Sequence, residues 1–253
     1  DNVRENSVNL IGQYRGGPDL KILKEYFDKL GIKLTCVLTS GCTLEEVKLA
    51  PIAYLNISMC EASGIEPCEL MEKKFGIPFL HETLPIGVKA TGNYLQEICK
   101  KLDRDYVFAE DEKRAEKELK KYLPYLRGKK AVIVAGATRA VALTRFLSEL
   151  GMEPVLICLD FEGKYTDSKM NEIIKERKIH PIILKQPDYT EILCEVENLK
   201  PDIIFGGMGE IGLSIELGIP LIDVMHGQEV TFGFEGSIRL ASKIKDILEV
   251  KSG

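Results

Sequence analysis

Short apolar runs alternate with amphipathic segments through the first half of the chain. Buried strands are predicted at residues 8–11, 33–38, 53–57 and 78–81. Helices are predicted between and after them, at residues 19–30, 43–50, 66–75 and 92–102. Strands that alternate with helices through short loops are typical of parallel sheets that carry helices on both faces.

The same alternation restarts after a charged segment that we expect to be a helix. Strands are predicted at residues 131–135, 153–158, 180–183, 202–205 and 220–223, and helices at 139–150, 168–177, 189–199, 211–217 and 238–248. We therefore predict an α/β fold of two Rossmann-like, doubly wound parallel-sheet domains joined by a charged helix. The expected domains are residues 1–110 and 129–253, with the connector at 111–128.

Composition excludes several classes of protein. The 253 residues carry a net charge of −5, which argues against binding to nucleic acid through a basic surface. No apolar run approaches the roughly 18 residues that a membrane span needs. Seven cysteines without CxxC spacing fit neither a disulfide framework nor a zinc ribbon, so we expect a reducing cytoplasm. Because the chain starts in polar residues without Met, we also expect that an N-terminal region is missing.

The residues that follow predicted strands are the candidates for chemistry, because doubly wound folds bind ligands beyond the carboxyl ends of their strands. Cys60 could bind a soft metal or an iron–sulfur cluster, or be a small core residue. Arg139, at the start of a helix, could stabilise an anion or be an ordinary surface arginine. His226, in a glycine-flanked loop, could bind a transition metal or be exposed.

Two further patterns favour structural interpretations. The spacing Gly207-x-Gly209-x-x-Gly212 matches the dinucleotide fingerprint, but it lies late in the chain and lacks an acid at the usual distance. A tight turn between a strand and a helix is therefore the favoured interpretation. Four cysteines fall within predicted strands or helices and are expected in the core: Cys36, Cys99, Cys158 and Cys194.

Several segments resemble, in the same order, segments of the nitrogenase component 1 family. They are Val8-Asn9-Leu10-Ile11-Gly12-Gln13-Tyr14, Leu55-Asn56-Ile57-Ser58-Met59-Cys60, Lys74-Phe75-Gly76-Ile77-Pro78, Leu150-Gly151-Met152-Glu153, Lys200-Pro201-Asp202, Leu217-Gly218-Ile219-Pro220 and Gly233-Phe234-Glu235-Gly236. The resemblance covers nearly the whole chain. It corresponds to the second and third domains of a molybdenum–iron protein α subunit or of its cofactor-assembly scaffold homologue, without the N-terminal domain.

This resemblance implies a set of residues around a complex iron–sulfur cofactor. Cys60 falls on the cysteine that binds an iron of that cofactor, and His226 on the histidine that binds its molybdenum. Arg139 falls on an arginine that faces the cofactor, and Asp160 on a glutamate beside it. All four are thus expected to bind the cofactor, with Cys60 and His226 as metal ligands, and no catalytic residue is assigned.

The resemblance also implies a function. It indicates an oxidoreductase subunit that holds an iron–sulfur cofactor in an interdomain cleft, pairs with a homologous subunit, and receives electrons from an ATP-hydrolysing iron protein. Two departures argue against a molybdenum nitrogenase. Glu210 replaces the lysine that contacts homocitrate, which favours an assembly scaffold. The loop between His226 and Gly236 is shorter than in the catalytic subunit, which favours a reductive cyclase that acts on a tetrapyrrole.

Two alternatives remain open at this point. One is a reductive cyclase that acts on a tetrapyrrole in the nickel-coenzyme biosynthesis of methanogens, for which Cys60 need not be a ligand. The other is a non-catalytic module that binds metal chelates, because the two-domain architecture alone does not determine chemistry.

Overall fold

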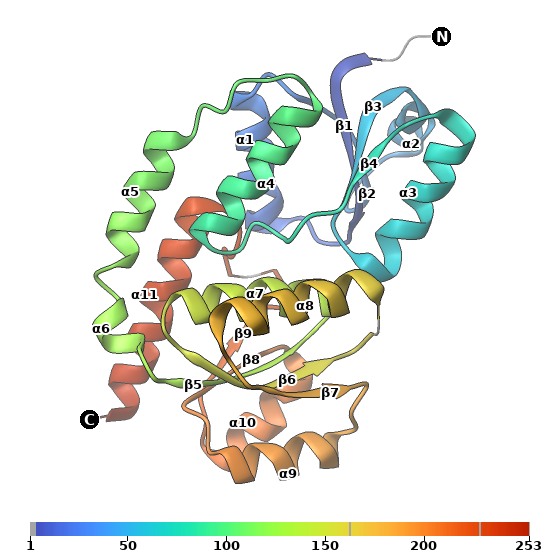
Figure 1. Ribbon diagram of the computed structural model, residues 1–253. Coiled ribbons are helices and arrows are strands. Elements are labelled where there is room, and N and C mark those ends of the chain that lie inside the picture. Colours follow the sequence, from blue (N-terminus) through green and yellow to red (C-terminus); the bar gives the residue numbers. More distant parts are fainter. Residues whose placement is uncertain (1–3, 162, 228, 253) are drawn as a thin grey trace.

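The structure, a computed structural model, describes residues 4–161, 163–227 and 229–252. Within these ranges all strand pairings are parallel, and they form two sheets (Figure 1). The first sheet, in the order β2-β1-β3-β4, contains β1 (Arg4–Gln13), β2 (Lys33–Thr39), β3 (Ala53–Ser58) and β4 (Phe79–Leu80). The second, in the order β7-β6-β5-β8-β9, contains β5 (Lys130–Ala135), β6 (Glu153–Leu159), β7 (Ile182–Lys185), β8 (Ile203–Gly206) and β9 (Leu221–Asp223). The predicted fold class is confirmed.

Helices connect these strands and cover the sheets. In the first half they are α1 (Gly17–Lys29), α2 (Leu44–Leu49), η1 (Ala50–Ile52), α3 (Glu61–Phe75), α4 (Val88–Lys101), α5 (Ala109–Leu119) and α6 (Leu123–Leu126). In the second half they are α7 (Ala137–Glu149), α8 (Lys164–Arg177), α9 (Tyr189–Leu199), η2 (Met208–Glu210), α10 (Ile211–Leu217) and α11 (Gly233–Ser252). None of the helices in the described ranges has the length and hydrophobicity that crossing a bilayer requires.

The second sheet is buried on both faces, which explains why its strands are continuous apolar runs. Val132 and Ile204 pack in one hydrophobic cluster with residues of α9 and α10. Ile133 and Phe205, each adjacent to one of them in the sequence, belong to the cluster on the opposite face. Because successive side chains of a strand point to opposite faces, each strand contributes to two cores.

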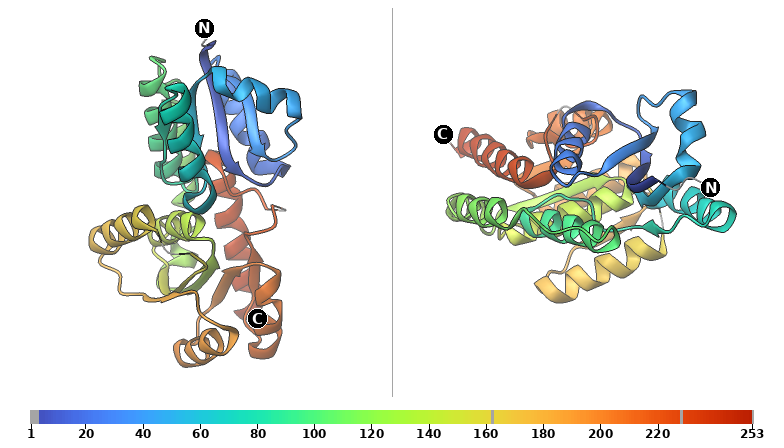
Figure 2. Two further views of the ribbon diagram at one scale, coloured as in Figure 1. Left: turned by 90° about the vertical axis from the view of Figure 1, so that its right-hand side faces the viewer. Right: turned by 90° about the horizontal axis from the view of Figure 1, so that it is seen from above.

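The two sheets share one of these cores. Helix α7 lies between them (Figures 1 and 2), and its Phe146 belongs to the same buried cluster as Leu10 and Ile57 of the first sheet. Helix α11 runs back along α5 and also contacts α1, α4 and α6. We propose that the chain divides at the connector, residues 111–128, with α11 covering parts of both units.

Several helix boundaries differ from the predicted ones. The connector is broken into α5 and α6, with Pro124 in the first turn of α6, where a missing N–H is tolerated. Helix α3 begins at Glu61 instead of residue 66, although Gly64 and Pro67 lie inside it. Helix α11 begins at Gly233, five residues before the predicted start at 238.

Three of the four cysteines predicted in the core are buried, and one is not. Cys36, Cys99 and Cys158 are nearly inaccessible, and burial raises the pKa of each thiol. Cys194 is exposed on α9, so its predicted burial was wrong. A helix covers the sheet with one stripe only, and Cys194 lies outside the stripe formed by Ile192 and Val196.

Candidate functional site

The carboxyl ends of strands from both sheets meet around one cavity of about 240 Å³, which we call the central cavity. Its lining residues come from the end of β1, from the loops and helix starts that follow β1, β3, β5, β6 and β9, and from the loop after β4. They are Gly12, Gln13, Tyr14, Arg15, Gly16, Asp19, Met59, Cys60, Leu84, Gly136, Thr138, Arg139, Asp160, Met225, Gly227 and Phe232. The strand order reverses between β1 and β3, which is the position where doubly wound sheets bind ligands.

Cys60 reaches this cavity because α3 begins very close to the first sheet. The residue precedes the first turn of α3, and the Ser58 hydroxyl donates a hydrogen bond to its carbonyl oxygen at 3.1 Å. A Cβ atom at Gly64 would lie 2.5 Å from the Ser58 Oγ and 2.9 Å from the Ile11 carbonyl oxygen. Glycine is therefore required for this approach of helix to strand. The Cys60 thiol is free and half-buried.

Arg139 lies in the wall of the central cavity as a largely buried cation. Its side chain is 15% exposed, and its Nη1 donates to the Thr231 Oγ1 at 2.8 Å. Its Nη2 lies 3.6 Å from the Asp19 Oδ2, and its guanidinium lies 5.3 Å from the centre of the Phe232 ring. Burial lowers the pKa of Arg139, and the Asp19 carboxylate opposes that shift. Such a cation can stabilise a bound anionic group.

Asp19 holds this arrangement together across the two halves of the chain. Its carboxylate is buried and accepts hydrogen bonds from the amides of Thr231 and Phe232 at 2.7 and 2.9 Å. The Thr231 hydroxyl also donates to it at 2.6 Å. The first turn of α1 is thus tied to the loop that precedes α11. Asp19 was not identified from the sequence, because its partners lie more than 200 residues away.

Arg15 is a second cation that sequence reasoning missed. It lies in the loop after β1, and its stem packs beside Gly227, where a Cβ atom would lie 3.5 Å from the Arg15 Cδ. Burial is the main cause of the lowered pKa of Arg139, and the nearby positive charge of Arg15 lowers it further, whereas the Asp19 carboxylate acts in the opposite direction. The available signal was its position after a strand, between Gly12 and Gly16, in a turn-like segment.

A second cavity of about 330 Å³ adjoins the central one and shares Arg15, Gly136, Asp160 and Met225 with it. Asp160 therefore faces both cavities, and its Oδ1 accepts a hydrogen bond from the first amide of α7, Ala137 N, at 3.2 Å. Three of the predicted site residues, Cys60, Arg139 and Asp160, line the central cavity. The fourth, His226, lines the second.

His226 is oriented by a carboxylate. Its Nδ1 lies 2.8 Å from the Asp223 Oδ2, which leaves Nε2 as the nitrogen available to a ligand. Burial alone would raise the pKa of Asp223, but hydrogen bonds from the Met225 amide and from the ring and amide of His226 lower it. A carboxylate on one ring nitrogen is the usual support of a metal-binding histidine.

The glycine-rich segment after β8 forms a tight turn against this histidine. A Cβ atom at Gly207 would lie 2.8 Å from the His226 Cε1 and 3.0 Å from the Met225 Cβ. The Gly207 amide donates to the Glu210 Oε2 at 2.6 Å, so the Glu210 carboxylate folds over the turn and forms part of the second cavity's wall. The segment thus positions His226, in agreement with the favoured turn interpretation.

The donor set fits a large group better than a single metal ion. Among the residues that the structure describes, no three His, Cys, Asp or Glu side chains converge as a mononuclear site would require. The two adjoining cavities are instead lined by the thiols of Cys60 and Cys158, the imidazole of His226, the guanidiniums of Arg15 and Arg139, and the carboxylates of Asp19, Asp160 and Glu210. A thiol and two guanidiniums on the same cavity suit a polynuclear, anionic iron–sulfur group. Taken together, the two adjoining cavities have the size usual for cofactor sites.

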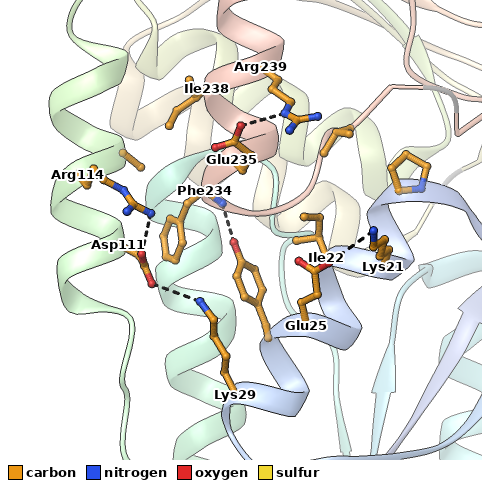
Figure 3. A pocket seen from close by; sticks show the side chains of 14 residues that line it. Lys21, Ile22, Glu25, Lys29, Asp111, Arg114, Phe234, Glu235, Ile238 and Arg239 are labelled. Carbon is orange, nitrogen blue, oxygen red and sulfur yellow. Dashed lines mark hydrogen bonds and ion pairs between the residues drawn. The ribbon is translucent and has the colours of Figure 1, made fainter.

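A third cavity, of about 390 Å³, lies away from the strand ends, between α1, α5 and α11 (Figure 3). Asp111 pairs with Arg114 at 2.8 Å and with Lys29 at 3.9 Å, and Glu235 pairs with Arg239 at 3.0 Å. Each of these charges thus has an oppositely charged partner in the wall of this third cavity.

Comparisons with known proteins agree with this architecture. The nitrogenase molybdenum-iron protein alpha chain of Methanothermobacter marburgensis is 31% identical over 246 residues, which cover 94% of this chain and 51% of that protein. The nitrogenase iron-molybdenum cofactor biosynthesis protein NifE of Clostridium pasteurianum is 32% identical over 248 residues, covering 94% and 54%. The chain thus spans about half the length of these relatives.

A solved structure and a family profile extend the agreement. The structure of nitrogenase Cp1 at pH 6.5 superposes with a TM-score of 0.85 at 20% identity, over 98% of this chain and 60% of that one, which shows the shared fold. The profile of the family described as nitrogenase component 1 type oxidoreductase matches residues 1–249. The chain therefore belongs to the nitrogenase component 1 type oxidoreductase family.

Proposed function

We propose that this chain holds an iron–sulfur cofactor, or the precursor of one, in the central and second cavities between its two sheets. One observation carries the proposal. The Cys60 thiol and the Arg139 guanidinium, which come from different sheets, line the same cavity at the strand ends. A soft ligand and a cation on the wall of one cavity suit an electron-rich cluster.

Each residue has a distinct role in this proposal. Cys60 would bind iron through its thiolate, and His226 would bind a metal through Nε2 while Asp223 holds the ring. Arg139 and Arg15 would offset the negative charge of the cluster, and Asp160, which accepts from the Ala137 amide, would lie beside it. The bound group would supply the capacity to accept and donate electrons.

We favour cofactor assembly over substrate reduction because of Glu210. Its carboxylate forms part of the wall of the cavity that His226 faces, where it would repel a polycarboxylate bound to the metal. The relatives support both roles, since one is named a molybdenum-iron protein alpha chain and another a cofactor biosynthesis protein. A homologous subunit and an ATP-hydrolysing iron protein are the proposed partners.

The first prediction tests the cluster. Anaerobic reconstitution of the intact protein with iron and sulfide should produce visible sulfur-to-iron charge-transfer absorption, and Cys60→Ser should bind markedly less iron because serine oxygen is a poor ligand for soft metals. Cys194→Ser is the matched control, since Cys194 is exposed on α9 and lines neither cavity. Equal iron content in the wild type and Cys60→Ser would refute the ligand role. Uptake of a tetrapyrrole in place of iron would favour the reductive cyclase.

A further inference from the structure

Glu61, the residue next to Cys60, joins the two sheets. It is only 8% exposed, and its carboxylate lies at the N-terminus of α8, in the other half of the chain. The Glu61 Oε1 accepts from the Tyr165 amide at 2.9 Å, and Oε2 accepts from the amide and hydroxyl of Thr166, each at 2.7 Å. Helix α8 has no capping hydrogen bond from its own N-cap residue, Gly163. Glu61 therefore caps α8 from the opposite domain.

The backbone of Glu61 is held as firmly as its side chain. Its amide donates to the Thr138 Oγ1 at 2.9 Å, and Thr138 lies in the first turn of α7. Glu61 is thus attached to α7 through its amide and to α8 through its carboxylate, whereas Cys60 itself follows β3 of the first unit. The place of the thiol depends on both units.

Gly163 is shaped to receive this carboxylate. A Cβ atom there would overlap the Glu61 carboxylate, while the backbone at Gly163 is extended and would accept alanine without strain. Replacing Gly163 with alanine should therefore displace the Glu61 side chain without changing any group of the central cavity.

We infer that Glu61 is a positioning residue for Cys60: by capping α8 across the domain boundary, it presents the thiol to the central cavity only while the two sheets are docked. The importance of this Glu61 contact for function rests on the proposed cofactor role of Cys60. The positioning itself is a property of the protein without any bound group, so it can be tested separately.

The test measures access to the thiol in the purified protein. Cys60 is alkylated with a bulky maleimide at alkaline pH, where access limits the reaction, and Cys194 in the same sample serves as the reference. Glu61→Gln and Gly163→Ala should each raise the ratio of the Cys60 rate to the Cys194 rate by roughly tenfold, as expected when hydrogen bonds to a charged group are lost. Thr166→Val, which removes one of the three bonds, should raise it less.

Two controls separate positioning from general loosening. Glu82→Gln makes the same acid-to-amide change at a half-buried pair with Lys169 of α8, whose charged atoms lie 3.9 Å apart, and should leave the ratio unchanged. Tyr26→Phe removes a buried hydrogen bond from the Phe234 amide at a residue that lines neither the central nor the second cavity, and it should also leave the ratio unchanged. After loading with iron and sulfide, the charge-transfer spectrum should change in Glu61→Gln and match the wild type in Glu82→Gln.

The outcomes are distinguishable. Wild-type ratios in folded Glu61→Gln and Gly163→Ala would overturn the inference, and so would equal increases in the two controls. If both of these variants fail to fold, the ratio in Thr166→Val decides instead. A protein that binds no iron would refute the proposed function, but the alkylation ratios would still decide the role of Glu61.

Discussion

At the residue scale, the site is built from groups that are individually weak signals. Cys60, Arg139 and His226 could be singled out because each follows a predicted strand, and loops at strand ends carry function in this fold class. Asp19 and Arg15 could not, because their importance lies in contacts with residues distant in the sequence. The positions of candidate ligands were thus predictable, whereas the network that orients them was not.

The carboxylate that holds His226 gives a prediction about pH. Replacing Asp223 with asparagine should lower the free energy of unfolding at neutral pH by about 1–2 kcal/mol, since the charged acceptor of three hydrogen bonds is lost. Because folding lowers the pKa of Asp223 below its ordinary value of 3.8, this stabilisation exists above that value and disappears as the pH falls through the folded pKa.

Urea denaturation of both proteins between neutral pH and about pH 3 checks this expectation. The difference between wild type and Asp223→Asn should shrink on acidification. Asp246→Asn, at a side chain that is 67% exposed, should match the wild type throughout. A difference that stayed constant down to acid pH would show that the carboxylate charge is not what stabilises the turn.

At the scale of elements, apolar periodicity identified strands and helices but misplaced several helix starts. Helix α3 begins early because tertiary contacts fix its first turn: Glu61 binds the second unit, and Gly64 lets the helix pack closely against the first sheet. These contacts outweigh the low helix propensity of Gly64 and Pro67. Such tertiary contacts cannot be predicted from the local pattern of apolar residues. The family resemblance, which rests on the order of short motifs, was confirmed.

The glycines after β8 provide a prediction at this scale. Gly207→Ala should destabilise the protein by about 1–3 kcal/mol, because its methyl group would collide with the His226 ring and the Met225 side chain. Gly209→Ala, in the same turn, meets no atom within 4 Å and should change stability by no more than about 0.5 kcal/mol. Urea denaturation of the two variants measures the contrast. Equal effects would mean that the turn does not brace the histidine.

At the scale of the whole molecule, two buried carboxylates join the first half of the chain to the second. Asp19 binds the loop before α11, and Glu61 binds α8. Together with the shared hydrophobic core, these contacts should make the two Rossmann-like units unfold as one. The prediction of two sheets was correct, but their common core could not be inferred, because apolar periodicity does not show which element each face meets.

Cooperativity can be measured directly. The wild type should give coincident urea transitions by far-ultraviolet circular dichroism and by tyrosine fluorescence, which is usable because the chain has nine tyrosines and no tryptophan. Asp19→Ala leaves Arg139 without its buried partner and should cost about 3 kcal/mol. The double variant Asp19→Ala/Glu61→Ala should separate the two transitions, whereas Glu110→Ala, at a highly exposed acid, should not. Coincident transitions in the double variant would show that the apolar core alone makes the two units unfold together.

The return of α11 along α5 also affects the order of events during synthesis. On the ribosome, Tyr26 and Phe108 leave the exit tunnel long before Phe234, the α11 residue whose ring lies 5.9 Å from that of Tyr26 and 6.4 Å from that of Phe108. The loop that supplies the partners of Asp19 emerges equally late. The nascent first unit can form its sheet, but the walls of the central cavity close only once α11 has been translated. In the proposed function, metal delivery to Cys60 in its final geometry would therefore be a post-translational event.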